Sequence, residues 1–306
     1  MPKVYGFTGY GGTDVQDFWD QPKPDPGPGE LLIAVRAAGV NPVDWKIRQG
    51  YLKDYMPLDL PAVLGREAAG VVEAIGKDVE GFAVGDEVLG TTAPNSGGYA
   101  EYTLLTADAA TRKPAQVSFV DAAALPVAAA TAFDAIQQLA LAPGSTLFIN
   151  GIGGGVGVAA AQIARDAGLS VIGTGGDGKR DLVESLGATF IDYRTDVVGA
   201  VLQILPDGVD AVLDLVGGNS LREVAELVKN RTKVLSAGDQ QTVEEVGGSP
   251  VQRVGTGAVL AQVAQLVADG KLNPHAVDVR PLDEAGEALQ AVESGHSRGK
   301  VVIEIR

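Results

Sequence analysis

The chain contains no cysteine and only two histidines among its 306 residues. Without thiols it can form no disulfide, no cysteine nucleophile and no metal site built from thiolates. His275 and His296 lie late in the chain beside proline or glycine, a setting more typical of surface loops than of metal ligands. The sequence therefore predicts a protein without a bound metal ion.

Long apolar runs are also missing, and no segment approaches the roughly 20 apolar residues that a membrane-spanning helix needs. Residues 1–6 lack the apolar core of a secretion signal. Acidic residues outnumber basic ones by 39 to 24, and an acidic surface repels the phosphates of nucleic acids and anionic lipids. We expect a soluble, cytoplasmic protein with neither a nucleic-acid nor a membrane partner.

Aromatic residues are scarce, at 5%, while glycine, alanine and valine are abundant. Small side chains suit the close packing of helices on a parallel sheet. A hydrophobic fraction of 45% is enough to bury the core of one large domain or two ordinary ones. Residues 1–117 indicate a β-rich region, because short apolar runs alternate there with glycine, proline and aspartate clusters; the runs are 31–35, 70–75 and 87–89.

The pattern changes at Ser118, which forms a predicted helix cap with Asp121 at the start of an alanine-rich segment ending at residue 141. Pro126 lies inside this segment and predicts a kink or break. Strands and helices then alternate, which predicts βαβ units around a parallel sheet and hence an α/β fold. The expected strands are 146–150, 170–174, 189–192, 209–216, 233–237 and 300–305. The expected helices are 155–167, 179–186, 197–205, 220–230, 259–269 and 283–294.

A glycine-rich turn follows the first of these strands. Five glycines occur within the seven residues from Gly151 to Gly157, and a helix of small residues begins there. Such a turn lets a pyrophosphate approach the backbone closely, and the helix start supplies unpaired N–H groups. The sequence predicts a dinucleotide site of the Rossmann type. The alternative is a structural turn that merely needs glycines.

The tip of the next strand indicates which nicotinamide cofactor is bound. An NAD site usually carries an acid there, whereas this strand ends in Thr174-Gly175-Gly176. Lys179 and Arg180 follow shortly after. A neutral tip with nearby cations favours the 2′-phosphate of NADPH. Alternatively, the two cations are solvated residues of the first helical turn.

Several stretches together resemble the zinc-independent quinone oxidoreductase branch of the medium-chain dehydrogenase/reductase superfamily, which includes zeta-crystallin-like proteins and enone reductases. They occur in family order across nearly the whole chain. Besides the glycine turn, they are 40–46 (VNPVDWK), 64–72 (LGREAAGVV), 84–88 (VGDEV), 97–102 (GGYAEY), 125–131 (LPVAAAT), 208–214 (GVDAVLD) and 295–300 (GHSRGK).

The resemblance implies two domains with the active site between them. Residues 1–120, completed by about 272–306, would form a GroES-like, partly open β-barrel, and residues 121–271 a Rossmann domain that binds NADPH. Homodimers are usual in the family. Its zinc-dependent members have cysteine where this chain has Asn41 and histidine where it has Arg66. The resemblance therefore implies hydride transfer without zinc.

The resemblance also assigns roles to single residues. In the catalytic set, Asn41 would face the nicotinamide and substrate, Asp44 would stabilise their loop, and Lys46 would donate to a carbonyl oxygen or to the nicotinamide ribose. The cofactor set would be Thr131 at the nicotinamide, Gly154, Gly155, Val156 and Gly157 at the pyrophosphate, Lys179 at the 2′-phosphate and Tyr193 at the adenosine.

Two departures from the family pattern bear on activity. Many quinone reductases have tyrosine where Lys46 stands, which favours enones and alkenals, and many have serine where Gly176 stands, which removes one phosphate donor. The expected activity is NADPH-dependent reduction of quinones or activated C=C bonds, with a small molecule as the partner. The alternatives are a non-catalytic, crystallin-like or redox-sensing NADPH-binding protein, and an enoyl reductase for acyl thioesters. Lys46 could also be an exposed barrel lysine.

Overall fold

The computed structural model describes residues 1–295, 297 and 299–306; His296 and Arg298, both in the 295–300 motif, lie outside the described residues. The chain forms two compact units. Unit 1 comprises Met1–Ala128, Gly255–Asp269 and Pro274–Arg306, and unit 2 comprises Ala129–Val254 and Gly270–Asn273. Within the described residues, no helix combines the length and hydropathy needed to cross a bilayer.

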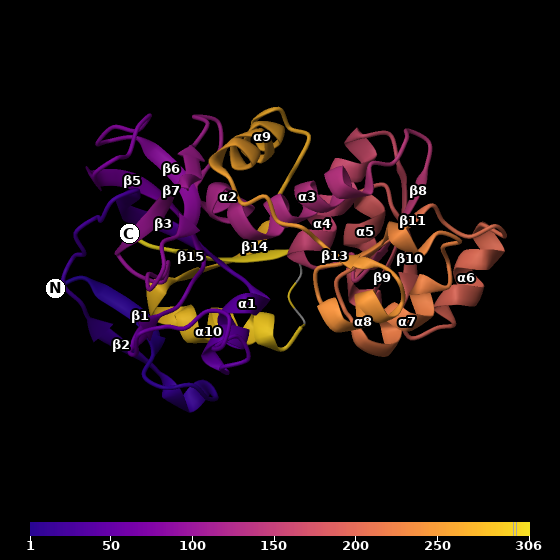
Figure 1. The fold of residues 1–306 in the computed structure, drawn as a ribbon, viewed down its shortest axis with the longest axis horizontal. Helices are drawn as coiled ribbons and strands as arrows, with labels where there is room; N and C mark the ends of the chain where they lie inside the picture. Colours follow the sequence, from indigo (N-terminus) through magenta and orange to yellow (C-terminus); the bar gives the residue numbers. More distant parts are fainter. Residues whose placement is uncertain (296, 298) are drawn as a thin grey trace. The chain divides into compact units, whose positions relative to one another are not determined.

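Unit 1 is built on a six-stranded sheet with the order β14-β15-β3-β5-β6-β7. Strand β3 also pairs with β7, so these two strands close into a ring with β5 and β6, as in a partly open barrel. Strand β15 comes from the end of the chain and pairs antiparallel with β3 (Figure 1). A second sheet has the order β2-β1-β4. The bounds are β1 Lys3–Phe7, β2 Gln16–Asp20, β3 Glu30–Val40, β4 Ala62–Val63, β5 Glu67–Ile75, β6 Glu87–Thr92, β7 Tyr102–Arg112, β14 Ala276–Pro281 and β15 Lys300–Glu304.

Four α-helices belong to unit 1: α1 Pro42–Arg48, α2 Phe119–Ala123, α9 Gly257–Ala268 and α10 Ala285–Glu293. The expectation of a loop at residues 41–46 is wrong, because α1 begins there. Asn41 at the cap, Pro42 at the first helical position and Asp44 in the first turn favour a helix start. Helix α9 lies in unit 1, where Gly257 packs against the backbone of Ala110 in β7; the predicted domain limits assign this helix to the other domain.

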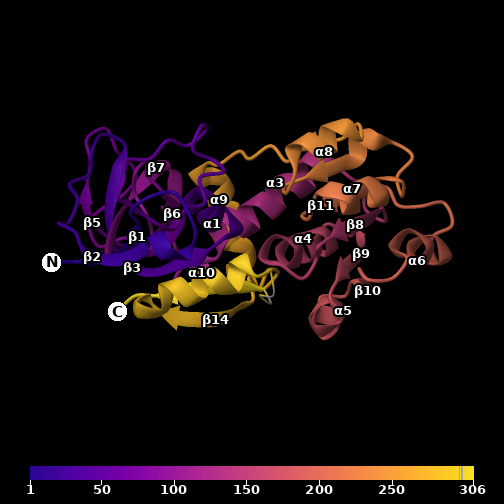
Figure 2. The same cartoon turned by 90° about the horizontal axis from the view of Figure 1, so that it is seen from below.

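Unit 2 contains a parallel sheet with the order β10-β9-β8-β11-β12-β13, which confirms the predicted α/β class. Figure 2 shows helices α7 and α8 on one side of these strands and α5 on the other. The strands are β8 Thr146–Asn150, β9 Ser170–Gly175, β10 Thr189–Asp192, β11 Ala211–Asp214, β12 Val234–Ser236 and β13 Ser249–Pro250. The helices are α3 Ala130–Leu139, α4 Gly155–Asp166, α5 Arg180–Ser185, α6 Val197–Ile204, α7 Gly218–Ala225 and α8 Gln240–Glu245.

The alanine-rich segment is interrupted as predicted. The Asp121 N–H donates to Ser118 Oγ at 3.0 Å and so caps α2. A π-helical turn at Leu125–Ala129 contains Pro126 and separates α2 from α3. Proline lacks an N–H and crowds the preceding turn, so the regular helical hydrogen bonds cannot continue through it.

Candidate functional site

The glycine turn of unit 2 is held by a polar network at the ends of three parallel strands. The Asn150 amide donates to Asp214 Oδ1 at 2.8 Å and to Ser220 Oγ at 2.9 Å. The Thr174 hydroxyl donates to Asn150 Oδ1 at 2.8 Å and accepts the Gly151 N–H at 3.0 Å. Sequence reasoning assigned no role to these side chains, although polar residues at the carboxyl ends of apolar strands were a signal for them.

The turn itself fits a dinucleotide. Gly151 has φ +91°, a conformation that other residues rarely adopt. A Cβ atom at Gly157 would lie 2.5 Å from the Ile152 carbonyl oxygen, so this glycine lets α4 pack on the turn. A Cβ atom at Gly154 would meet nothing closer than 4.0 Å, which leaves the backbone open to a ligand. Gly155, Val156 and Gly157 form the first turn of α4, where N–H groups have no partner within the helix.

A cavity of about 380 Å³ lies beside this turn. Lys179 and Tyr193 line it together with two glycines of the turn, Gly151 and Gly153, and two of the β9 tip, Gly175 and Gly176. The Lys179 side chain runs so close to Gly153 that a Cβ atom there would lie 2.3 Å from Lys179 Cδ. Two of the predicted cofactor residues, Lys179 and Tyr193, therefore line the same cavity. The predicted Thr131 is buried in α3 of the same unit.

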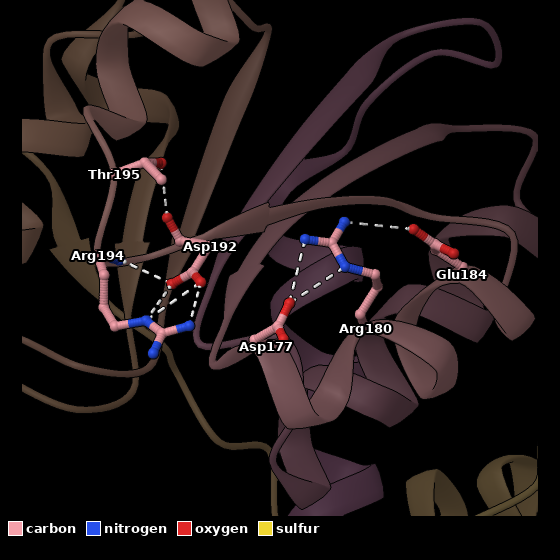
Figure 3. Close-up of polar contacts among 6 residues, drawn as sticks. All are labelled: Asp177, Arg180, Glu184, Asp192, Arg194 and Thr195. Carbon is pink, nitrogen blue, oxygen red and sulfur yellow. Dashed lines mark hydrogen bonds and ion pairs between the residues drawn. The ribbon is translucent and has the colours of Figure 1, made fainter.

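Figure 3 shows two arginines near the ends of β9 and β10 that already have acidic partners. Arg180 contacts Asp177 at 3.3 Å and Glu184 at 3.6 Å, and its guanidinium lies 4.4 Å from the centre of the Phe190 ring. Arg180 is therefore paired with one acid just before its helix and one within it, whereas its neighbour Lys179 lines the cavity.

The second arginine in Figure 3, Arg194, forms a bidentate ion pair with Asp192, in which Nε donates to Oδ1 and Nη2 donates to Oδ2. Hydrogen bonds from the Arg194 side chain and backbone lower the pKa of Asp192 to about 2. Asp192 consequently stays ionised at neutral pH and neutralises the charge of Arg194.

In unit 1, Asn41 belongs to a buried network of charged groups. Its Nδ2 donates to Glu67 Oε1 at 2.7 Å, and the Lys300 ammonium donates to Asn41 Oδ1 at 2.6 Å. Lys300 also binds Glu67 Oε1 at 2.5 Å and the Val40 carbonyl at 3.0 Å. Both ends of the Asn41 amide are thereby fixed. Sequence reasoning missed Glu67 and Lys300, although a charged residue at the first position of a largely apolar strand was a signal for each.

Asp44 is fully enclosed beside this network. Its Oδ2 accepts the Asn41 N–H at 2.8 Å and the Tyr99 hydroxyl at 2.9 Å, while Oδ1 has no hydrogen-bond partner among the described residues. Burial raises the pKa of Asp44 to about 6, although these two hydrogen bonds act in the opposite direction. The carboxylate holds the backbone at the start of α1.

Lys46 lies on α1, half-buried, with its ammonium 5.8 Å from the centre of the Trp45 ring. The structure thus places the three predicted catalytic residues on α1 and its cap in unit 1, and the predicted cofactor residues in unit 2. Asn41, which the resemblance aligns with a zinc ligand, is buried, and Arg66, which it aligns with another, is half-buried. Among the described residues, no cluster of three or more histidine, aspartate or glutamate side chains could hold a metal ion.

Comparisons with known proteins agree with this fold. Residues 27–115 match the alcohol dehydrogenase GroES-like domain, and residues 186–303 match the family described as zinc-binding dehydrogenase. A chloroplastic quinone-oxidoreductase homolog from Spinacia oleracea is 31% identical over 97% of both chains. The 2-methylene-furan-3-one reductase of Solanum lycopersicum is 33% identical over 98% of this chain and 78% of its own.

Solved structures lead to the same family. The quinone oxidoreductase from Coxiella burnetii superposes with a TM-score of 0.90 at 31% identity, covering 100% of this chain and 99% of its own. The chain belongs to the quinone oxidoreductase branch of the medium-chain dehydrogenase/reductase superfamily, as the resemblance indicated. It is an oxidoreductase with a GroES-like domain and a nucleotide-binding domain.

Proposed function

We propose that the protein uses NADPH, without zinc, to reduce quinones or activated C=C bonds in small molecules. The observation that carries the cofactor choice is the cavity of unit 2, where Lys179 lies beside the uncharged β9 tip at Gly175 and Gly176. The names of the two relatives, a quinone oxidoreductase homolog and an enone reductase, support the substrate class.

Each part of the dinucleotide has residues suited to hold it. Lys179 binds the 2′-phosphate and Tyr193 the adenosine, since both line the cavity. The N–H groups at Gly154–Gly157 bind the pyrophosphate, and Thr131 contacts the nicotinamide end. When bound, the reduced nicotinamide supplies the hydride.

The protein then has to stabilise the negative charge that develops on the acceptor's carbonyl oxygen. Lys46 donates to that oxygen. The Asn41 side chain supplies a further donor: Glu67 accepts one of its two amide N–H groups and Lys300 donates to its oxygen, which leaves the second N–H for the acceptor. Hydrogen-bond donors take the place of a Lewis acid here.

Chelation tests whether the reaction needs a metal ion. Exhaustive chelation should leave turnover intact, because the proposed mechanism uses no zinc. Stoichiometric zinc in the purified protein, with loss of activity on its removal, would contradict a zinc-independent mechanism.

Substitution of Lys179 tests the cofactor choice. In a fluorescence titration the wild type should bind NADPH more tightly than NADH. Lys179→Ala should weaken NADPH binding by about 1–3 kcal/mol, because a charge-assisted contact is lost, and should leave NADH nearly unchanged. Arg180→Ala is the matched control, since Asp177 and Glu184 already bind that side chain. Equal wild-type affinities for the two cofactors would contradict the proposal.

The family resemblance further supports a homodimer, in which unit 1 is the catalytic domain and unit 2 the nucleotide-binding domain. We also propose that the protein acts in the cytoplasm. Sedimentation velocity tests the oligomeric state. A monomer at micromolar concentration would contradict that part of the proposal.

A further inference from the structure

Arg66 is an incompletely paired cation in unit 1. It directly precedes β5 and is half-buried, yet among residues 1–295, 297 and 299–306 its guanidinium makes one long hydrogen bond, from Nη2 to the Thr92 carbonyl at 3.5 Å. Within the described chain, no carboxylate lies within ion-pair distance of it. A guanidinium carries five N–H donors in a rigid fork, so most of its donors remain available for a ligand.

Other enclosed cations of the same unit are paired. Arg48 is fully buried, and its two terminal nitrogens bind the two Glu293 carboxylate oxygens at 3.1 and 2.8 Å. Lys300 is enclosed by Asn41, Glu67 and the Val40 carbonyl. Both of these cations are more deeply buried than Arg66. Because shielding a charge from water without pairing it is costly, the half-buried and incompletely paired Arg66 favours a ligand.

The surroundings of Arg66 favour an oxygen ligand of negative charge. Burial lowers the pKa of Arg66, but the ordinary pKa of a guanidinium lies so far above neutrality that the group stays charged. Asp44 attracts it through space, but neither Asp44 oxygen lies within ion-pair distance of the guanidinium. Asp44 also accepts the Asn41 N–H. The guanidinium therefore lies near the carboxylate that fixes the start of α1.

We infer that Arg66 binds the carbonyl oxygen of the acceptor and the negative charge that forms on it, which selects planar conjugated carbonyl compounds whose reduced form is an enolate or a phenolate. This inference rests on the proposed function. Hydride adds to the β-carbon of an enone, the alkene electron pair shifts to form the enolate, and its oxygen stays on Arg66. A proton from water then adds to the α-carbon and regenerates the carbonyl.

Binding of 4-nitrophenolate tests the inference without cofactor or turnover, because this probe is coloured only as its anion. Absorbance titrations of the full chain should show that the wild type binds the anion in preference to the neutral phenol. Arg66→Met should weaken binding about tenfold or more, as for a lost charge-assisted hydrogen bond, and Arg66→Lys should fall between the two. Arg36→Met is the control, because Arg36 is an exposed arginine of the same unit.

Turnover provides an independent readout. With a quinone or an enone, Arg66→Met should lower kcat, and millimolar guanidinium should restore part of the loss in this variant but not alter Arg36→Met. Wild-type affinity for 4-nitrophenolate in Arg66→Met, or no anion preference in the wild type, would overturn the inference. If the anion binds through Arg66 but no nicotinamide cofactor does, the proposed function fails while the oxyanion site stands. If folding of Arg66→Met is impaired, Arg66→Gln removes the charge with a polar side chain and provides the same comparison.

Discussion

Asp44 shows how one enclosed carboxylate makes the stability of unit 1 depend on pH. Its pKa is about 6 in the folded protein and 3.8 ordinarily, so between these values the folded state holds a proton that the unfolded chain has released. The stabilisation linked to this proton is complete below about pH 3.8 and is lost as the pH rises to about 6. At neutral pH, ionised Asp44 therefore lowers the free energy of unfolding by about 3 kcal/mol, because one pKa unit corresponds to about 1.36 kcal/mol.

The variant Asp44→Asn should remove that dependence while keeping an oxygen that accepts from Asn41 and Tyr99. The free energy of unfolding of the variant minus that of the wild type should increase between pH 4 and pH 6.5, by at most about 3 kcal/mol. Urea denaturation at a series of pH values measures it. The exposed Asp25→Asn serves as the control. A constant difference across this range would mean that Asp44 titrates normally.

Lys46 is the residue on which the catalytic proposal can be tested most directly. If its ammonium polarises the acceptor carbonyl, Lys46→Met should lower kcat and kcat/KM together, because the interaction strengthens as charge develops. Loss of one such donor costs about 2.7–4 kcal/mol, or roughly 100- to 1000-fold in rate. The exposed Lys53→Met should retain wild-type kinetics. A raised NADPH dissociation constant with unchanged kcat would instead make Lys46 a ribose ligand.

At the scale of the secondary-structure element, two glycines of one turn should respond differently to the same substitution. Gly157→Ala places a methyl group against the Ile152 backbone at 2.5 Å, so α4 must shift and stability should fall by about 1–3 kcal/mol. Gly154→Ala meets no atom within 4.0 Å apart from the Gly151 oxygen at that distance, so the fold should tolerate it.

The methyl group of Gly154→Ala would nevertheless occupy the space proposed for the pyrophosphate. We therefore expect a wild-type melting temperature with weakened NADPH binding for this variant, and loss of both properties for Gly157→Ala. Differential scanning fluorimetry with and without NADPH separates the two effects. Unchanged NADPH affinity in Gly154→Ala would place the pyrophosphate elsewhere.

The elements that could be predicted are those whose signal is local. Strand β8 and the start of α4 follow from an apolar run, glycines and small residues, and the structure has both at the predicted residues. Helix α1 has only seven residues and follows β3 closely, so its local sequence signal is too short to predict a helix. Strand β14 is also short and ends in proline, which weakens the signal for a strand.

The buried network of unit 1 could not be predicted in the same way. Glu67 and Lys300 are 233 residues apart, and nothing near either residue indicates its partner. Only the pairing of β15 with β3, and of β3 with β5, brings their side chains together. Likewise, whether Arg66 has an ion-pair partner depends on how far the fold places each carboxylate from its guanidinium, which the sequence does not indicate.

At the scale of the whole molecule, the two units should respond differently to nucleotide. Both tryptophans, Trp19 and Trp45, belong to unit 1, whereas the proposed nucleotide cavity belongs to unit 2. NADPH at about 100 times its dissociation constant should stabilise the state that binds it by about 2.7 kcal/mol. The thermal transition followed by far-ultraviolet circular dichroism should therefore shift upward, while that followed by tryptophan fluorescence should shift less. Equal shifts would show that the units unfold as one.

The contact between Lys300 and Asn41 also has a consequence for protein synthesis. The two residues are 259 positions apart, so the ribosome synthesises Asn41 long before Lys300, whose ammonium fixes the Asn41 amide. Until β15 has left the ribosome and paired with β3, the buried Glu67 carboxylate lacks its cation. Unit 2 is encoded wholly between these two positions and can complete its sheet first. A nascent chain stalled before residue 300 should accordingly bind nucleotide before it can catalyse reduction.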